Sequence, residues 1–192
     1  SPYNVAQEIY IDMIPVTDYI TSGVWQIILN PTRVVEGQYD LWLPSENVLN
    51  RGTGFLYPDE EVTLTIPSTA DKVISVGAYD ALTFSYASFS GRGYTWQDER
   101  TKPDLVAPGV NVRTTAVGGG VTVVSGTSFA TPFVTGASAL LMEWGIVRGN
   151  DPFLYGEKVK AYLRRGAREL PGFGKYPNRE VGYGEDVIIR LH

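Results

Sequence analysis

Hydrophobic and polar residues alternate over several stretches of the first 66 residues. The alternation is clearest in residues 9–13, 24–30, 39–43 and 62–66, and Asn, Gly and Pro residues separate these stretches. Alternation of hydrophobic and polar residues with a period of two, interrupted by turn-forming residues, predicts half-buried antiparallel strands joined by hairpins. Strands of this kind pack as a small β-sandwich, so we expect an antiparallel β-sandwich module of jelly-roll type over residues 1–67.

The pattern changes after residue 67. Short apolar runs at residues 72–78 and 105–110 predict buried strands of a parallel sheet, and residues 121–124 predict a further strand. A long apolar run predicts a helix over residues 128–144. Asp151-Pro152 is a typical N-cap and first-turn pair, which predicts a second helix over residues 152–166. Residues 68–192 are therefore expected to form part of an α/β domain with a parallel sheet.

Composition narrows the functional classes. The 192 residues carry a formal net charge of −5 and no cysteine. Disulfides, cysteine–zinc sites and thiol nucleophiles are therefore excluded, and nucleic acid is not an expected partner. Residues 1–70 are strongly acidic, whereas the remainder carries a small basic excess, which supports a module boundary near residue 67. We see no apolar run of the length of a membrane span, and we expect no cofactor and no metal site.

One motif carries candidate chemistry. Residues 125–128 read Ser-Gly-Thr-Ser and precede the apolar helical run. Gly126 allows a sharp turn, and a serine at a helix N-terminus lies beside free N–H groups that favour developing negative charge. Ser128 is thus a candidate nucleophile, with Gly126 and Thr127 supporting the loop and the Ser128 N–H as an oxyanion donor. The alternative is that Ser128 only caps the helix.

The serine motif resembles that of subtilisin-like serine proteases, the subtilases of peptidase family S8. Three further stretches resemble the same family in order and spacing: Ala-Ser-Phe-Ser at residues 87–90, Asp-Leu-Val-Ala-Pro-Gly at residues 104–109, and Gly-Tyr-Gly at residues 182–184. The resemblance covers roughly residues 67–190. It implies a hydrolase that cleaves peptide bonds through an acyl-enzyme on Ser128, as a bacterial serine endopeptidase does.

The family also needs an aspartate, a histidine and an oxyanion asparagine in motifs that this chain does not contain. The single histidine is His192, the last residue. The resemblance therefore implies that residues 68–192 are the C-terminal portion of a subtilase catalytic domain and that the rest of the triad lies on an N-terminal part. We expect the isolated chain to be nearly inactive. The alternative is a pseudoprotease or protein-binding scaffold in which Ser128 is only a helix cap.

Residues 10–67 stand where an ordinary subtilisin has a short loop. Trp25-Gln26-Ile27 and residues 39–44, Tyr-Asp-Leu-Trp-Leu-Pro, resemble an inserted β module of subtilases from Clostridia-like bacteria. The resemblance implies an extracellular, cell-envelope or spore-envelope location. The partners it implies are a protein or peptide substrate and the N-terminal part of the same protease. We also expect self-association through apolar surface that the missing part would cover.

Charged residues outside the serine motif allow two interpretations. Asp98, Glu99 and Asp104 suggest a cation site, but we favour a solvated loop with Arg100 and Lys102 beside it. The basic residues of the second predicted helix favour an exposed helix face; they are Lys158, Lys160, Arg164, Arg165 and Arg168.

Overall fold

The structure is a computed structural model that describes residues 8–35, 37, 39–44, 48–94 and 101–186. The chain divides into two compact units, Ser1–Gly54 and Phe55–His192. The α-helices, the π-helical turn and the strands of the described residues lie in the second unit.

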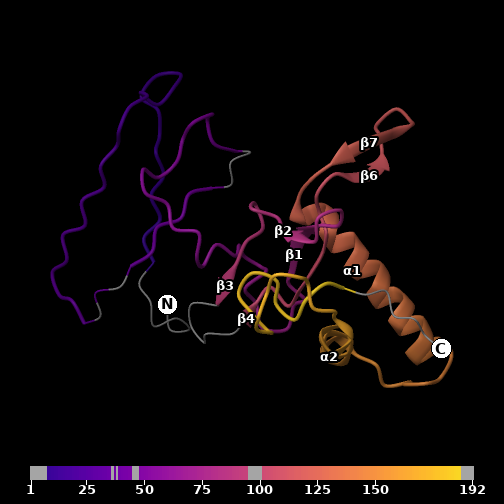
Figure 1. The fold of residues 1–192 in the computed structure, drawn as a ribbon. Coiled ribbons are helices and arrows are strands. Elements are labelled where there is room, and N and C mark those ends of the chain that lie inside the picture. The colour runs from indigo at the N-terminus through magenta and orange to yellow at the C-terminus, as the bar shows by residue number, and fades with distance from the viewer. Residues whose placement is uncertain (1–7, 36, 38, 45–47, 95–100, 187–192) are drawn as a thin grey trace. The chain divides into compact units, whose positions relative to one another are not determined.

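A mixed sheet forms the centre of the second unit (Figure 1). Strand β1 (Val76–Asp80) lies between β2 (Ser85–Tyr86), with which it pairs antiparallel, and β5 (Leu105–Pro108), with which it pairs parallel. The parallel register places Val76 beside Leu105 and Ala78 beside Ala107. Leu105, Ala107 and Ala78 are fully buried, as continuous apolar strands of a parallel pair require. The predicted α/β architecture with parallel strands is confirmed, with one antiparallel edge.

Two short antiparallel ladders accompany the sheet. Strand β3 (Gly93–Tyr94) pairs with β4 (Thr101–Lys102), and β6 (Val112–Thr115) pairs with β7 (Val121–Val124). Residues 118–120 close the second hairpin, and all three are glycines with positive φ, which other residues rarely adopt. This hairpin leads directly into the serine motif.

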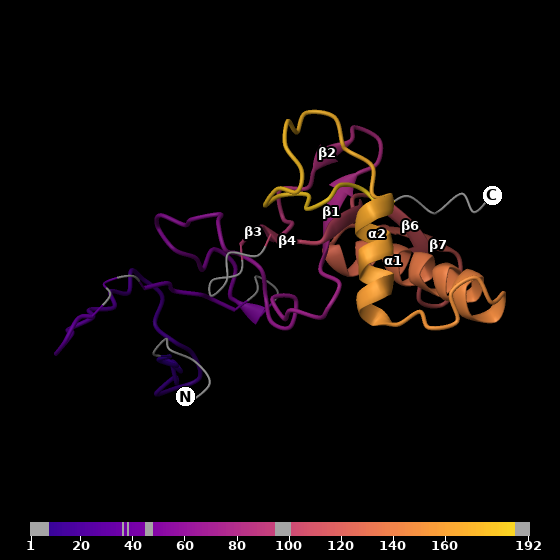
Figure 2. The ribbon, with the colours of Figure 1, turned by 90° about the horizontal axis from the view of Figure 1, so that it is seen from below.

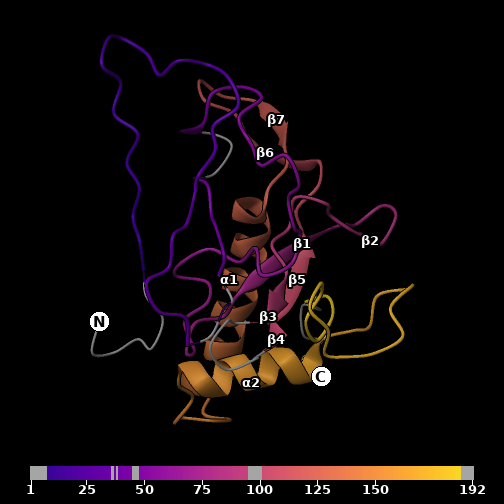
Figure 3. The ribbon, with the colours of Figure 1, turned by 90° about the vertical axis from the view of Figure 1, so that its left-hand side faces the viewer.

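Helix α1 (Thr127–Met142) packs along β1 and β5 (Figure 3). Its buried residues are Ala130, Val134, Ala137 and Leu141, at the spacing of one helical face. One π-helical turn, η2 (Glu143–Val147), continues it, and helix α2 (Gly156–Gly166) packs against α1 (Figure 2). Val159 and Leu163 of α2 complete the core beside Leu141.

The second helix begins later than the sequence predicts. Its N-cap is Tyr155, and residues 151–154 form a turn in which the Leu154 N–H donates to the Asp151 carbonyl at 3.1 Å. The Asp151 carboxylate does not cap the helix but accepts a hydrogen bond from Lys158 Nζ at 2.6 Å. The turn places Leu154 in the core against Gly145 of η2, where a Cβ atom would lie 2.8 Å from Leu154 Cδ2. Packing of Leu154 thus outweighs the N-cap preference of Asp151.

The first unit shows no strand among its described residues. Trp25, Ile27 and Leu29, which the alternation places on one face, are 60%, 58% and 54% exposed. An alternating strand is stabilised by a partner strand and by a layer that buries its apolar face, and neither is seen in the described part of 8–54. The predicted β-sandwich is not confirmed, and the predicted boundary at residue 67 stays a prediction.

α1 and η2 together form one helix of 21 residues, Thr127–Val147, and its most apolar window of 18 residues has a mean hydropathy of 1.2. By length and composition alone this helix could cross a membrane, although the sequence showed no uninterrupted apolar run of that length. Its Ala130, Val134, Ala137 and Leu141 pack in the core of an α/β unit, which also explains an apolar helix.

Candidate functional site

Ser128 lies in the first turn of α1, and its side chain is exposed. Gly126, not Ser128, is the N-cap residue, and no side chain caps the helix. Ser128 is therefore the second residue of the helix, and the interpretation of Ser128 as a helix cap is not favoured. The side chain is presented to solvent at the end of the strand–helix connection.

Backbone contacts between two loops hold the serine in place. The Gly126 N–H donates to the Gly109 carbonyl at 2.8 Å, and the Asn111 N–H donates to Ser125 Oγ at 2.9 Å. Gly109 follows β5 directly, and its own N–H donates to the Tyr79 carbonyl of β1 at 3.0 Å. The position of the serine loop is thus fixed by the ends of the two central strands.

Both glycines are required by geometry. Gly126 has φ 152°, a value that side-chain-bearing residues rarely adopt. A Cβ atom on Gly109 would lie 2.5 Å from Ala78 Cβ and 3.1 Å from the Gly126 carbonyl oxygen. Gly126 therefore supports the turn as predicted from the sequence, whereas the need for Gly109 follows only from the approach of two loops in space.

The helix start offers free hydrogen-bond donors. Among the described residues, the N–H groups of Thr127 and Ser128 have no acceptor, whereas those of Phe129 and Ala130 donate to the Gly126 carbonyl at 3.0 and 3.3 Å. Unpaired N–H groups at a helix N-terminus carry partial positive charge and stabilise a nearby anion. The arrangement fits the expected role of the Ser128 N–H as an oxyanion donor.

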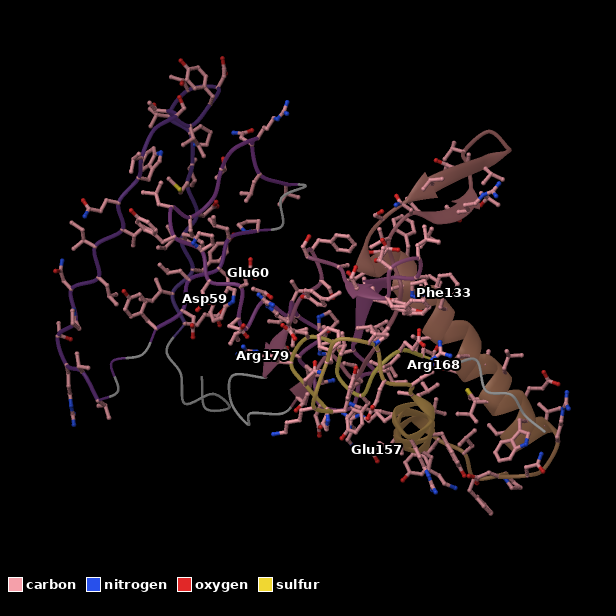
Figure 4. All side chains as sticks on the ribbon, in the orientation of Figure 1. Asp59, Glu60, Phe133, Glu157, Arg168 and Arg179 are labelled. Atoms are coloured by element: carbon pink, nitrogen blue, oxygen red, sulfur yellow. The ribbon has the colours of Figure 1, made fainter. Side chains whose placement is uncertain are left out.

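Pro132 lies beyond the first turn of α1. It is the sixth residue of α1 and therefore cannot donate to the Ser128 carbonyl, four residues earlier. The next residue, Phe133, is 40% exposed on α1 (Figure 4). The helix nevertheless continues without interruption to Met142.

The described residues supply no histidine, since His192 lies outside them. They also show no hydrogen bond to the Ser128 side chain and no group of three metal-ligating side chains. The described part of the chain thus holds the serine and its loop but no general base in contact with it.

Asp104 does not lie in a solvated loop, contrary to the interpretation favoured from the sequence. It is fully buried, and Lys102 Nζ lies 3.1 Å and Arg164 Nε 3.0 Å from its carboxylate. Burial alone would raise the pKa of Asp104, but the Ser75 N–H, Arg164 and Lys102 together lower it below its ordinary value. Asp98 and Glu99 lie outside the described residues.

The basic residues of α2 do not all form an exposed face either. Lys160 is only 8% exposed, and its ammonium donates to the carbonyls of Asp71 and Val73 at 2.8 and 2.9 Å. Arg164 is half-buried against Asp104, whereas Arg165 is exposed, as is Arg168, which follows the end of α2. A run of like charges on one helix gave no signal that two of its members would meet the buried Asp104, which lies between β4 and β5.

Comparison with known proteins decides the family. The model of the subtilase family matches residues 56–184, which include both strands of the parallel pair, the serine loop and both α-helices. The chain belongs to the subtilase family. Subtilases are serine peptidases, so the hydrolase and serine protease class expected from the motifs is confirmed at the level of the family.

The relatives of this subtilase chain include bacterial and animal proteases. The solved structure of the CspB protease of Clostridium perfringens is 49% identical with a TM-score of 0.69, and the match covers 73% of this chain and 30% of that one. Serine protease AprX of Bacillus subtilis is 34% identical over 129 residues, 57% of this chain and 27% of its own length. The membrane-bound transcription factor site-1 protease of Mus musculus is 37% identical over 135 residues, 68% of this chain.

This subtilase chain spans only a part of those proteins. It covers 12% of the site-1 protease, and less than one third of both the AprX protein and the CspB chain.

Proposed function

We propose that this subtilase chain carries the nucleophilic serine of a serine endopeptidase. Ser128 Oγ attacks the carbonyl carbon of a peptide bond and passes its proton to a base. The amine leaves with a proton from that base, and water then hydrolyses the acyl-enzyme ester. The observation that supports this role is the exposed Ser128 hydroxyl on the first turn of α1, beside two N–H groups without an acceptor among the described residues.

The rest of the machinery is proposed to lie on an N-terminal part of the same protease. That part would supply the histidine base, the aspartate that orients it and an oxyanion asparagine. Residues 68–192 would then form the C-terminal portion of the catalytic domain, and residues 1–67 an inserted β module of the antiparallel sandwich type. The 30% coverage of the CspB chain supports this division, because most of that protease lies outside the match.

The proposed substrate is a protein or peptide, and the proposed location is extracellular or in a bacterial cell or spore envelope. Bacterial relatives named as serine proteases support the proposed substrate. The proposed location rests on the resemblance of residues 10–67 to the inserted module of Clostridia-type subtilases, because one bacterial relative is named an intracellular protease. The scaffold alternative is weaker because Gly126 occupies the N-cap position that this alternative assigns to Ser128.

Fluorophosphonate labelling tests the role of Ser128. The full-length protease is expected to be labelled at Ser128, and Ser128→Ala should abolish both labelling and peptidase activity. The matched control is Ser138→Ala on the same helix, where the hydroxyl only donates to the Val134 carbonyl at 2.7 Å. Labelling of the full-length Ser128→Ala variant at an unchanged level would refute the proposal.

The same probe tests the divided active site. Without its base a serine protease loses on the order of 10⁴ to 10⁶ in kcat, so the 192-residue chain alone should remain unlabelled. Labelling of the isolated chain at Ser128 would show that the base comes from within these 192 residues and would overturn the proposed division.

A further inference from the structure

A cavity of about 450 Å³ opens beside α2, separate from the serine loop. Basic side chains predominate among its charged walls: Lys72, Lys102, Lys160 and Arg164 line it, together with Asp71 and Glu157. Glu157 lies in the first turn of α2 (Figure 4). Lys72 and Glu157 are exposed and 3.6 Å apart, so they form the solvent-facing rim.

Beneath the rim, three cations share one carboxylate. Lys102 and Lys160 approach the two Asp104 oxygens at 3.1 and 3.3 Å, and Arg164 approaches from α2 with its Nε at 3.0 Å. Lys102 is 1% and Lys160 8% exposed, so both ammonium groups are largely withdrawn from water. Their other partners are the neutral carbonyls of Asp71 and Val73. With Asp71, Lys72 and Glu157 of the lining included, four cations meet three carboxylates around this cavity, so an excess of positive charge remains. Buried charge is costly when it is not fully compensated.

Donors remain available toward the cavity. Arg164 uses Nε and Nη2 for Asp104, and its Nη1 has no acceptor among the described residues. The Tyr183 ring, which also lines the cavity, lies under the guanidinium with 4.9 Å between the Arg164 Cζ atom and the ring centroid. This stacking fixes the guanidinium plane, so that its unused edge is preorganised.

We propose that this cavity binds a small tetrahedral oxyanion, sulfate or phosphate, on the free edge of Arg164 and beside Lys72, Lys102 and Lys160. A guanidinium edge and adjacent ammonium groups are the groups that proteins use for such anions. The cavity is large enough to admit the ion with part of its hydration shell. The bound anion offsets the excess positive charge around Asp104 and thereby stabilises the contact of α2 with the strands.

The lowered pKa of Lys160 agrees with an excess of positive charge around this cavity. Burial, together with the charges of Lys102 and Arg164, lowers the pKa of Lys160 to about 8 against the opposing effect of Asp104. Asp71, Lys72, Glu157 and Tyr183 also line this cavity. An anion placed there favours the charged form of Lys160.

Thermal unfolding of the full chain at pH 7 tests the proposal, with sulfate compared against chloride at equal ionic strength. Sulfate carries its full charge at pH 7. It also stabilises proteins in general, and this general effect should be the same in the unaltered chain and in the variants. We expect Tm to rise by several degrees with half-saturation in the low millimolar range. Both rim residues are exposed, so their substitution should leave the fold intact. Lys72→Gln should weaken sulfate binding and raise the half-saturating concentration severalfold. Glu157→Gln should strengthen binding and lower the half-saturating concentration severalfold.

Lys158→Gln is the matched control. Lys158 lies on the same helix, pairs with Asp151 at 2.6 Å and does not line the cavity, so the response to sulfate should match that of the unaltered chain. A response that is unsaturated and equal in all four proteins would show a general salt effect and overturn the proposal. Saturation with opposite shifts in the two rim variants would support it.

Discussion

Gly109 determines the position of the serine loop because its backbone lies so close to Ala78 and to Gly126 that no side chain fits there. The Gly109 N–H donates a hydrogen bond to the Tyr79 carbonyl of β1, and the Gly109 carbonyl accepts one from the Gly126 N–H at 2.8 Å. A single residue thus joins the central strand to the turn before Ser128. The serine motif itself could be recognised in the sequence, but this contact joins residues 17 positions apart and depends on the strand order.

Gly109→Ala should therefore disturb the serine loop more than the fold. The added methyl group meets Ala78 Cβ at 2.5 Å, and overpacking of this kind costs about 1–3 kcal/mol. We expect a lower Tm and a marked loss of fluorophosphonate labelling at Ser128 in the full-length protease. Gly174→Ala, where a Cβ atom meets nothing within 4 Å, serves as the control. Normal labelling of the Gly109→Ala protein would contradict the structural role.

Lys160 should make stability depend on pH. The pKa of Lys160 is lowered by burial from 10.5 to about 8. Between these values the unfolded chain binds more protons than the folded chain, so the free energy of unfolding rises as pH increases from 8 toward 10.5. Burial and the Glu185 hydrogen bond raise the pKa of Tyr79 above its ordinary value of 10.0, which acts in the opposite direction above pH 10. The window for Lys160 is therefore pH 7 to 9.5.

Urea unfolding in chloride buffer at the two ends of this window measures the effect. We expect a gain of about 1–2 kcal/mol at pH 9.5, reduced from the full linkage value because the site opens to solvent. Lys160→Met should remove most of the gain, and Lys158→Met should keep it. Equal stability of the unaltered chain at both pH values would show that Lys160 is not perturbed by its neighbours.

At the scale of elements, the sequence pattern was reliable where local and tertiary preferences agree. Strand β7 matches its predicted range of residues 121–124, and α1 begins one residue before the prediction. The predicted start of α2 was wrong because burial of Leu154 competes with the capping preference of Asp151. The outcome of this competition depends on the packing of the folded core, which the sequence pattern does not contain. The burial of Lys160 was missed for the same reason, since its partners Asp71, Val73 and Asp104 lie far away in the sequence.

Helix α1 has one face in the core and one face open within the described structure. Gly136, at the middle of the helix, is exposed, and a Cβ atom there would meet nothing within 4 Å. Gly136→Ala should stabilise the 192-residue chain by about 0.5–1 kcal/mol, because alanine loses less backbone entropy in a helix than glycine. Urea unfolding of both proteins measures this. A destabilised variant would mean that another group packs closely on Gly136 in solution.

At the scale of the whole molecule, the open face of α1 determines how the chain behaves in solution. Phe133, Leu140 and Met142 are 40%, 49% and 43% exposed, and they continue to Ile146 and Val147 of η2. Phe133 and Leu140 line an apolar hollow of about 490 Å³ on this helix. Apolar surface gathered along one helix favours association with another apolar surface.

The 192-residue chain should therefore self-associate, with a weight-average mass that rises with concentration in multi-angle light scattering. Leu140→Lys places a charge within the open face and should shift the equilibrium strongly toward the monomer. Leu82→Lys introduces the same charge at a side chain that is 84% exposed in the turn between β1 and β2, so it should leave self-association unchanged. Because both substitutions remove an exposed leucine, a difference between them assigns the association to α1 and not to hydrophobicity in general. A monomeric unaltered chain at the highest concentration, or equal effects of both variants, would show that the face of α1 does not drive association.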